Sequence, residues 1–266
     1  MKKSLILPLA VALSAACHPV SKDLRTYALN CKAIEISVQS DTLEFPYTVC
    51  FDPKGRVETV TTSDFDGSFR FGETYRYDSH GQLMEISGVN DENELEIRYE
   101  YDYAGKFIRE CRAYGMNNQE MHRWVHENDG RHIVKTDYYS EGELAFTTTK
   151  SFAGHHYEEE TCQSDGQVMG RASVDYFETE EKPMRIVGDD LDIEITYNEK
   201  GLPVMSRDAV LNSRGELQWA PDLEEHPLRY YRYEYDKRGN WISRADSVHP
   251  DSTAYAVLKR TITYQK

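Results

Sequence analysis

Hydrophobic and polar residues alternate one by one along much of the chain, which predicts β-strands with one apolar face. In LEIRYEYD (95–102), Leu95, Ile97, Tyr99 and Tyr101 alternate with charged residues. The same alternation recurs at 191–198 and 231–235. Because successive side chains of a strand point to opposite faces of a sheet, these segments are predicted to be half-buried strands.

Turn signals separate these strands about every dozen residues, the spacing expected for consecutive hairpins. In the pattern Asp-x-x-Gly, the first residue accepts hydrogen bonds from backbone N–H groups two and more residues ahead. The glycine supplies a positive φ without steric cost. Asn93 and the pair Asn117–Asn118 lie where the rhythm lacks a glycine. The predicted turn-forming residues are Asp52 with Gly55, Asp78 with Gly81, Asp102 with Gly105, Asn198 with Gly201, Asn212 with Gly215, and Asp236 with Gly239.

This punctuation predicts an all-β fold, an antiparallel meander of about 16–18 short strands without helical crossovers. A flat sheet of that size would leave its apolar face in water. We therefore expect the sheet to curl into a barrel-like or spiral form, with residues 31–266 as one β-meander domain. A membrane-spanning barrel is the alternative, but the turns are short on both sides, and HHYEEET (155–161) would set a carboxylate against lipid.

The first residues have the pattern of an export signal. Lys2 and Lys3 precede an apolar run (5–13), and small residues lead directly to Cys17. We expect residues 1–16 to be a lipoprotein signal peptide, Cys17 to be acylated, and residues 17–30 to be a tether. Ser14 occupies the place where such signals usually carry Leu, so ordinary cleavage after Ala16 is the alternative. No later stretch approaches ~18 consecutive apolar residues, so no membrane-spanning helix is expected.

Charge excludes several partners. The chain has 31 basic and 46 acidic residues, a net charge of −15. Nucleic acids need clustered Lys and Arg, so no nucleic-acid partner is expected. Attachment to anionic lipid through basic side chains is disfavoured for the same reason. Tyr is abundant, with 19 copies, and it suits strand faces that are partly exposed to water.

Four cysteines remain beside Cys17, and disulfides are allowed in an exported chain. Cys31 and Cys50 are placed symmetrically about Ser40–Asp41, so a hairpin there would set them opposite each other. This predicts either a disulfide between them or two packed thiols. Cys111 and Cys162 are not hairpin partners, and they could meet only in a curled sheet; their pairing is left open.

Candidate chemistry is sparse. His122 and His126 share a strand face, but no cysteine or aspartate stands at metal-ligand spacing, so no metal or other cofactor is expected. No nucleophile and base are arranged as catalysis requires, and no catalytic residue is proposed. Trp219 is the candidate binding residue because it lies in 217–227, the longest irregular stretch. Trp241 follows a turn, where core packing is favoured.

The motifs YRYDSHG (75–81), YEYDYAG (99–105) and YEYDKRG (233–239) resemble the YD repeat of RHS-like proteins. Together with the leader, the chain resembles small YD-repeat lipoproteins of Bacteroidota-type bacteria, some of which carry a soluble porin-like β-barrel. The resemblance implies a curved β-sheet and a cell-envelope location in the outer membrane or periplasm. It implies no catalytic residues.

Three functions are consistent with these features. The first is a non-enzymatic, lipid-anchored and monomeric β-scaffold, held to the membrane by its N-terminal lipid, that binds an envelope protein, a glycan or an apolar ligand. The second is a polysaccharide hydrolase with paired carboxylates. The third is a structural or neutralising partner of a secreted RHS-type toxin. A soluble periplasmic or secreted protein is the alternative location if Cys17 is not acylated.

Overall fold

The computed structural model describes residues 33–40, 46–64, 66–178, 180, 182–189, 191–211, 217–219 and 228–264, and the regular elements in these ranges are all strands. The chain divides into two compact units. Unit 1 is Ile97–Ile195, and unit 2 joins the described residues before Ile97 to those after Ile195. Across the described residues, no helix is long and apolar enough to cross a membrane.

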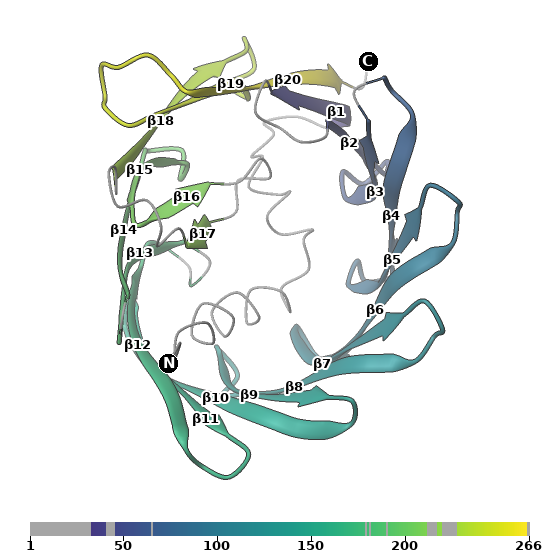
Figure 1. Ribbon diagram of the computed structural model, residues 1–266, viewed down its shortest axis with the longest axis vertical. Coiled ribbons are helices and arrows are strands. Elements are labelled where there is room, and N and C mark those ends of the chain that lie inside the picture. The colour runs from purple at the N-terminus through teal and green to yellow at the C-terminus, as the bar shows by residue number, and fades with distance from the viewer. Residues whose placement is uncertain are drawn as a thin grey trace, which may run out of the picture. The chain divides into compact units, whose positions relative to one another are not determined.

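Unit 1 is a meander of nine antiparallel strands, each paired with the next one along the chain. The sheet is visibly curved from β6 to β14 (Figure 1). The strands are β6 (Leu95–Ala104), β7 (Phe107–Gly115), β8 (Glu120–Asn128), β9 (Ile133–Ser140), β10 (Glu143–Ala153), β11 (His156–Gln163), β12 (Val168–Tyr176), β13 (Pro183–Gly188) and β14 (Leu191–Tyr197).

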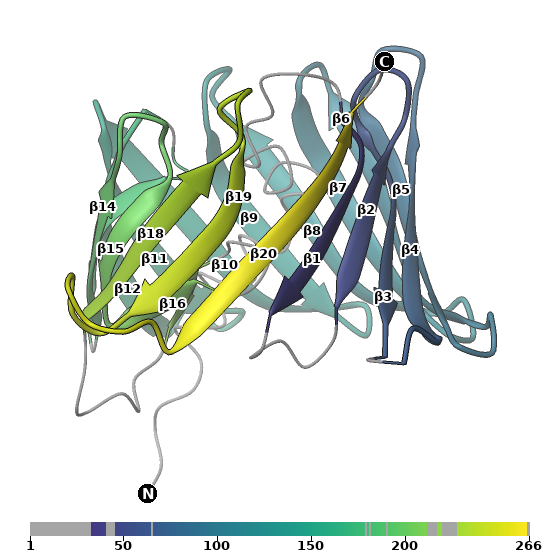
Figure 2. The ribbon, with the colours of Figure 1, turned by 90° about the horizontal axis from the view of Figure 1, so that it is seen from above.

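Unit 2 is built from both ends of the described chain, because β20 pairs with β1. Its sheet order is β15, β18, β19, β20, β1, β2, β3, β4, β5, all antiparallel (Figures 1 and 2). In the sequence, β16 and β17 come between β15 and β18, and they form a separate two-stranded sheet. The strands are β1 (Ala33–Ser40), β2 (Tyr47–Phe51), β3 (Val57–Ser63), β4 (Phe69–Tyr77), β5 (Leu83–Asn90), β15 (Pro203–Arg207), β16 (Ala209–Leu211), β17 (Leu217–Trp219), β18 (Leu228–Tyr235), β19 (Trp241–Ser247) and β20 (Ala256–Tyr264).

The predicted all-β, antiparallel meander is therefore confirmed, with eighteen strands in the meander pairing of the described residues. Burial follows the alternation read from the sequence. In β12, for example, Gly170, Ala172, Val174 and Tyr176 are buried, whereas their neighbours are more exposed. Trp241 is buried, as its position after a turn predicts.

The Asp-x-x-Gly turns have the predicted geometry in most hairpins. The Asp78 carboxylate accepts hydrogen bonds from the backbone N–H groups of His80 (2.9 Å) and Gln82 (2.8 Å). The bond from Gln82 lowers the pKa of Asp78. Gly81 has φ +87°, and the same positive sign is found at Gly55, Gly201 and Gly239.

Asparagine replaces glycine where the rhythm lacks one. Asn93 has φ +61° and closes a turn in which Asn90 accepts N–H bonds from Glu92 and Glu94. Asn118 has φ +57° at the next such place. Asparagine tolerates the left-handed region better than most residues, which explains how it can stand in for glycine.

The turn predicted at Asp102–Gly105 is of a different kind. Ala104 pairs directly with Phe107, so the loop holds Gly105 and Lys106 alone. Asp102 lies inside β6, where its carboxylate accepts the Tyr103 N–H and the Arg109 guanidinium. Gly105 keeps a positive φ of 63°, which a two-residue hairpin turn requires. The prediction that Asp102 forms the turn is wrong because the strand continues past it.

The tyrosine before the turn aspartate caps the turn of the preceding hairpin on the same edge of the sheet. The Tyr77 hydroxyl donates to the Val57 carbonyl (2.8 Å), and its ring lies 4.3 Å from the Arg56 guanidinium. Tyr235 receives a hydrogen bond from Asn198 and stacks with Lys200. At Tyr77 and Tyr235, the "Tyr-Asp" pair thus links one turn to the neighbouring turn.

Candidate functional site

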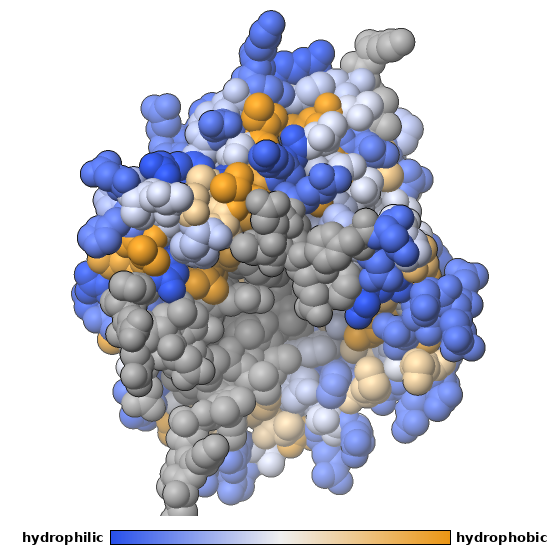
Figure 3. Space-filling view, turned by 45° about the horizontal axis from the view of Figure 1, so that its top comes forward, coloured by the Kyte–Doolittle hydropathy of each residue, from blue (hydrophilic) through white to orange (hydrophobic). Residues whose placement is uncertain are grey.

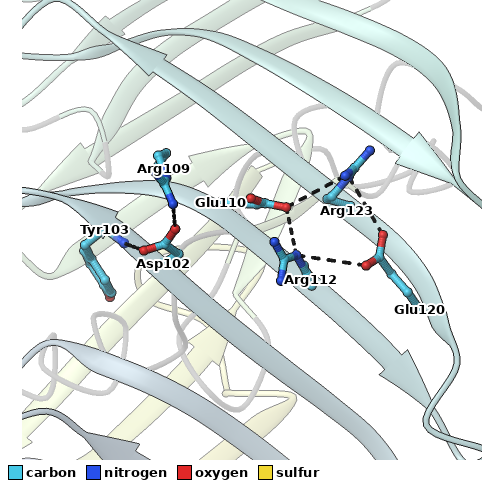
Figure 4. Close-up of polar contacts among 7 residues, drawn as sticks. All are labelled: Asp102, Tyr103, Arg109, Glu110, Arg112, Glu120 and Arg123. Carbon is cyan, nitrogen blue, oxygen red and sulfur yellow. Dashed lines mark hydrogen bonds and ion pairs between the residues drawn. The ribbon is translucent and has the colours of Figure 1, made fainter.

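One face of the unit 1 sheet carries networks of charged side chains. Glu110 contacts Arg112 at 2.8 Å, and Arg112 and Arg123 both reach Glu120, at 4.0 and 3.8 Å (Figure 4). These side chains are partly or well exposed, and hydrophilic residues cover much of the described surface in Figure 3. Charged groups of this kind belong in water, so this face is suited to solvent.

The opposite face of β8 to β12 is partly to fully buried, and its side chains are arranged in rows that run across the strands. The first row, here called the Trp124 row, contains Trp124, Tyr138 and Phe146, which are direct cross-strand neighbours. Tyr138 lies between the other two, with ring centroids 5.4 Å from Trp124 and 4.5 Å from Phe146. Its hydroxyl is hydrogen-bonded to His122 at 2.8 Å.

The second row has three threonines at its centre. It is called the threonine row and consists of His126, Thr136, Thr148, Thr161 and Gly170 in direct register. His126 is hydrogen-bonded to Thr136 at 2.9 Å, and Thr148 to Thr161 at 3.0 Å. Each threonine keeps a further lone pair, so the row is a line of hydroxyl groups within a buried face.

An ion pair lies next to the threonine row. Lys150 Nζ is 3.4 Å from Glu159 Oε2 and 4.6 Å from the centre of the Tyr157 ring. Burial alone would lower the pKa of Lys150, but its electrostatic interactions with Tyr157, Glu159 and Glu180 raise it. Lys150 therefore remains a cation, and Glu159 offsets its charge.

A second set of rings, the Phe152 row, follows beyond this pair. It contains Phe152, Tyr157 and Tyr176, with successive ring centroids 5.2 and 6.2 Å apart. The His132 ring stacks flat on Phe152 at 4.1 Å and meets Glu180 at 2.6 Å. This end of the face therefore combines rings with a histidine–carboxylate pair.

Unit 2 has a buried polar cluster of its own. The Arg244 guanidinium makes two hydrogen bonds to Asp246, of 2.9 and 3.0 Å, and a third to the Leu211 carbonyl. The Tyr231 hydroxyl bridges Ser206 and the Leu211 N–H. These contacts fasten β16 to the large sheet, so the cluster has a structural role.

The chemistry of these groups supports binding. In the described residues, no three His, Cys, Asp or Glu side chains are placed to hold a metal ion together. The buried face of β8 to β12 offers flat rings for packing and hydroxyl, imidazole and ammonium groups for hydrogen bonds. Such a combination of apolar surface with a few polar groups is typical of ligand sites.

The cysteine predictions are only partly testable. Cys17 and Cys31 lie outside the described residues, whereas Cys50, Cys111 and Cys162 are free thiols. Cys50 lies opposite Glu35, four residues from the predicted Cys31. The predicted register is wrong because the β1–β2 pairing is centred further along the chain than Ser40–Asp41.

Trp219, the predicted binding residue, lies in a strand and not in a loop. Its backbone lies at the end of β17, opposite Ala209, so the stretch 217–227 is not irregular from its start. The loop reading missed the strand because β17 is only three residues long. A binding role for Trp219 stays a prediction. Asn212 and Gly215 lie outside the described residues.

Sequence reasoning missed the threonine row. Thr136, Thr148 and Thr161 belong to three strands, and the alternation of each strand does not reveal their register. The signal in the sequence was polar residues at positions where the alternation predicts apolar ones, as in TTTK (147–150) and EEET (158–161). The three threonines could be aligned with one another only if the hairpin registers were known.

A scan of protein-family models gives no match, and a search of curated proteins gives none. Among solved structures, the chain is similar to a porin-like protein from Bacteroides uniformis ATCC 8492, with 10% identity and a TM-score of 0.42, over 86% of this chain and 96% of that one. It is also similar to the structure of TcdB2-TccC3-Cdc42, with 12% identity and a TM-score of 0.30, over 76% of this chain and 13% of that one. Likeness at this level carries no argument about function.

Proposed function

We propose that this protein is a lipid-anchored, non-enzymatic β-scaffold of the cell envelope that binds its ligand on the buried face of β8 to β12. The observation that carries the proposal is the arrangement of that face. Two rows of rings flank a row of hydroxyl groups. Beside that row, the charge of Lys150 is offset by Glu159. A face built only for stability would gain more from apolar side chains, since buried polar groups cost energy unless paired.

The anchor is proposed from the sequence. Cys17 follows an export signal, and the YD-like motifs resemble those of small lipoproteins from Bacteroidota-type bacteria. The charged face of unit 1 supports a tethered protein over one inserted in a bilayer. A Lys or Arg side chain at the lipid-facing midplane of a membrane sheet costs about 2–4 kcal/mol.

A polysaccharide hydrolase is the second candidate. Glu159 and Glu180 are the carboxylates whose charges raise the pKa of Lys150 beside the threonine row, so they are the pair to test there. Each is already engaged, Glu159 by Lys150 and Glu180 by His132. A hydrolase needs one free carboxyl group as acid and another as base or nucleophile, so binding without cleavage is favoured.

Two measurements test the proposal. Cys17→Ser should move the protein from the membrane to the soluble fraction and abolish incorporation of labelled palmitate; unchanged labelling would contradict the anchor. Incubation of the mature protein with envelope and dietary polysaccharides should release no reducing ends. Release that Glu159→Gln and Glu180→Gln abolish would establish the hydrolase instead.

A further inference from the structure

We propose that one end of the unit 2 sheet faces the membrane and contacts anionic phospholipid headgroups. This inference rests on the lipid anchor of the proposed function and adds which part of the protein lies against the lipid. Consecutive antiparallel strands run in opposite directions, so alternate hairpin turns lie at opposite ends of the sheet (Figure 2).

One end of the unit 2 sheet, here called the basic end, is formed by the turns at 52–56, 78–82, 198–202 and 236–240. These turns carry five cationic side chains, and all of them except Arg56 are exposed. The five are Lys54, Arg56, Lys200, Lys237 and Arg238.

Most carboxylates at the basic end are occupied by their own turns. The Asp236 carboxylate accepts the backbone N–H groups of Arg238 and Asn240, each at 2.9 Å. Asp52 and Asp78 accept backbone N–H groups of their turns in the same way, and Glu199 is the fourth acidic residue. The negative charge of three of the four carboxylates is thus directed at turn backbone, while the exposed cations face water.

Tyrosine rings support the cations of the basic end. Lys200 Nζ lies 4.7 Å from the centre of the Tyr235 ring, and the Arg238 guanidinium lies 4.1 Å from that of Tyr264. Tyrosine rings and basic side chains are both suited to the interface between water and lipid headgroups. The basic end therefore has the composition of a surface that contacts headgroups.

The other end of the unit 2 sheet, here called the acidic end, has the opposite charge. It is formed by the turn residues 64, 66–68, 91–94, 208 and 248–255. No lysine or arginine lies among these described turn residues, although Arg70 of β4 reaches Asp64 at 3.5 Å. An anionic membrane would repel this end. Its seven carboxylates are those of Asp64, Asp66, Asp91, Glu92, Glu94, Asp208 and Asp251.

The position of the tether is an independent observation. Ala33, the first residue of β1, lies opposite Tyr264, whose hydroxyl contacts Asp236. Residues 17–32 therefore join the sheet at the basic end. Turning the acidic end to the membrane would require the chain to run back along strands about 30 Å long.

The net charge of −15 disfavours attachment to anionic lipid by charge alone. The acyl chain on Cys17 supplies the attachment in this proposal, and the uneven distribution of charge supplies the orientation.

The experiment is lysine labelling with acetic anhydride, read by mass spectrometry, on the acylated protein in phosphatidylcholine vesicles with or without phosphatidylglycerol. Lys54, Lys200 and Lys237 should be labelled at least about fivefold more slowly with phosphatidylglycerol, the factor that one cation contributes near an anionic surface. Lys259 is exposed within β20, away from the turns, and its labelling should not change. High salt should remove the protection.

Lys237→Glu should raise the labelling of Lys54 and Lys200 on anionic vesicles at least about fivefold. Lys259→Glu makes the same change of charge away from the basic end and should leave their protection intact. If circular dichroism shows that Lys237→Glu disturbs the fold, Lys200→Glu replaces it, with Lys54 and Lys237 as the readout.

Protection of Lys259 equal to that of the basic-end lysines overturns the inference, as does equal protection on the two kinds of vesicle. Inorganic phosphate that protects the same lysines equally in the soluble Cys17→Ser chain would also overturn it, in favour of a free anion. In each of these cases, sedimentation of the acylated protein with vesicles leaves the anchor standing. A protein that sediments with neither kind of vesicle rejects the anchor and this inference with it.

Discussion

Replacing Gly81 tests whether the turns between strands are held by backbone geometry or by contacts. Gly81 has φ +87°, and a Cβ added there would meet only Arg56 Nη1, at 3.7 Å, an ordinary contact distance. The cost of Gly81→Ala therefore comes from the left-handed backbone alone, about 1–2 kcal/mol for a residue with a Cβ. A β-branched residue is worse suited to positive φ, so Gly81→Val should cost more.

Asparagine at the same position gives the sharpest comparison. Asn93 occupies the equivalent place in the turn that begins at Asn90, with φ +61°. Gly81→Asn should therefore destabilise less than Gly81→Ala, although asparagine is the larger residue. If steric contacts set the cost, the larger asparagine would destabilise more than alanine. The comparison therefore distinguishes backbone geometry from contacts.

Urea unfolding followed by circular dichroism measures these effects. For a domain of this size, each kcal/mol also shifts the melting temperature by about 2–4 °C. Ser79→Ala, in the same turn but without a backbone requirement, is the control and should stay within about 0.5 kcal/mol of wild type. The reasoning fails if Gly81→Ala is as stable as wild type or if Gly81→Asn is the less stable of the two.

Three further predictions concern charge. Asp246→Asn leaves the Arg244 guanidinium buried without its carboxylate and should destabilise unit 2 by about 3–5 kcal/mol in urea unfolding; a loss below 1 kcal/mol would mean that the pair is not desolvated. The pKa of His156 is raised mainly by its hydrogen bond to Asp175 and also by its hydrogen bond to Glu158. Its stabilisation is thus complete below the unfolded value of about 6.5 and lost as pH rises through the higher folded value, so His156→Gln should remove that step from stability measured against pH. Glu110→Gln on the charged face should cost less than about 1 kcal/mol in urea unfolding and less still in high salt, since its arginine partners are partly exposed to solvent.

Local chemistry made the hairpins predictable. Asp78 and Gly81 fix their turn through hydrogen bonds and φ within a few residues, so the sequence alone indicates where the strands end. The same local reasoning located Asn93 as a substitute for glycine. Strand alternation identified buried residues such as Tyr101.

Features that depend on register between strands were not predictable. Cys50 lies opposite Glu35 because the β1–β2 hairpin is centred elsewhere than symmetry suggests. The strand continues through Asp102 because a two-residue turn forms at Gly105 and Lys106 in place of the longer Asp-x-x-Gly turn. The threonine row forms only when four hairpin registers bring its members into line, and single-strand periodicity cannot specify these registers.

The tyrosine caps make the hairpins of unit 2 dependent on one another. Tyr77 holds the turn before it, and Tyr264, at the end of β20, does the same for the turn that begins at Asp236. Deleting a single hairpin would remove one tyrosine ring and expose the adjacent turn. The deletion should therefore destabilise the neighbouring hairpin as well. Adding or removing a hairpin beside these turns would therefore preserve them only if each turn kept or gained a capping tyrosine.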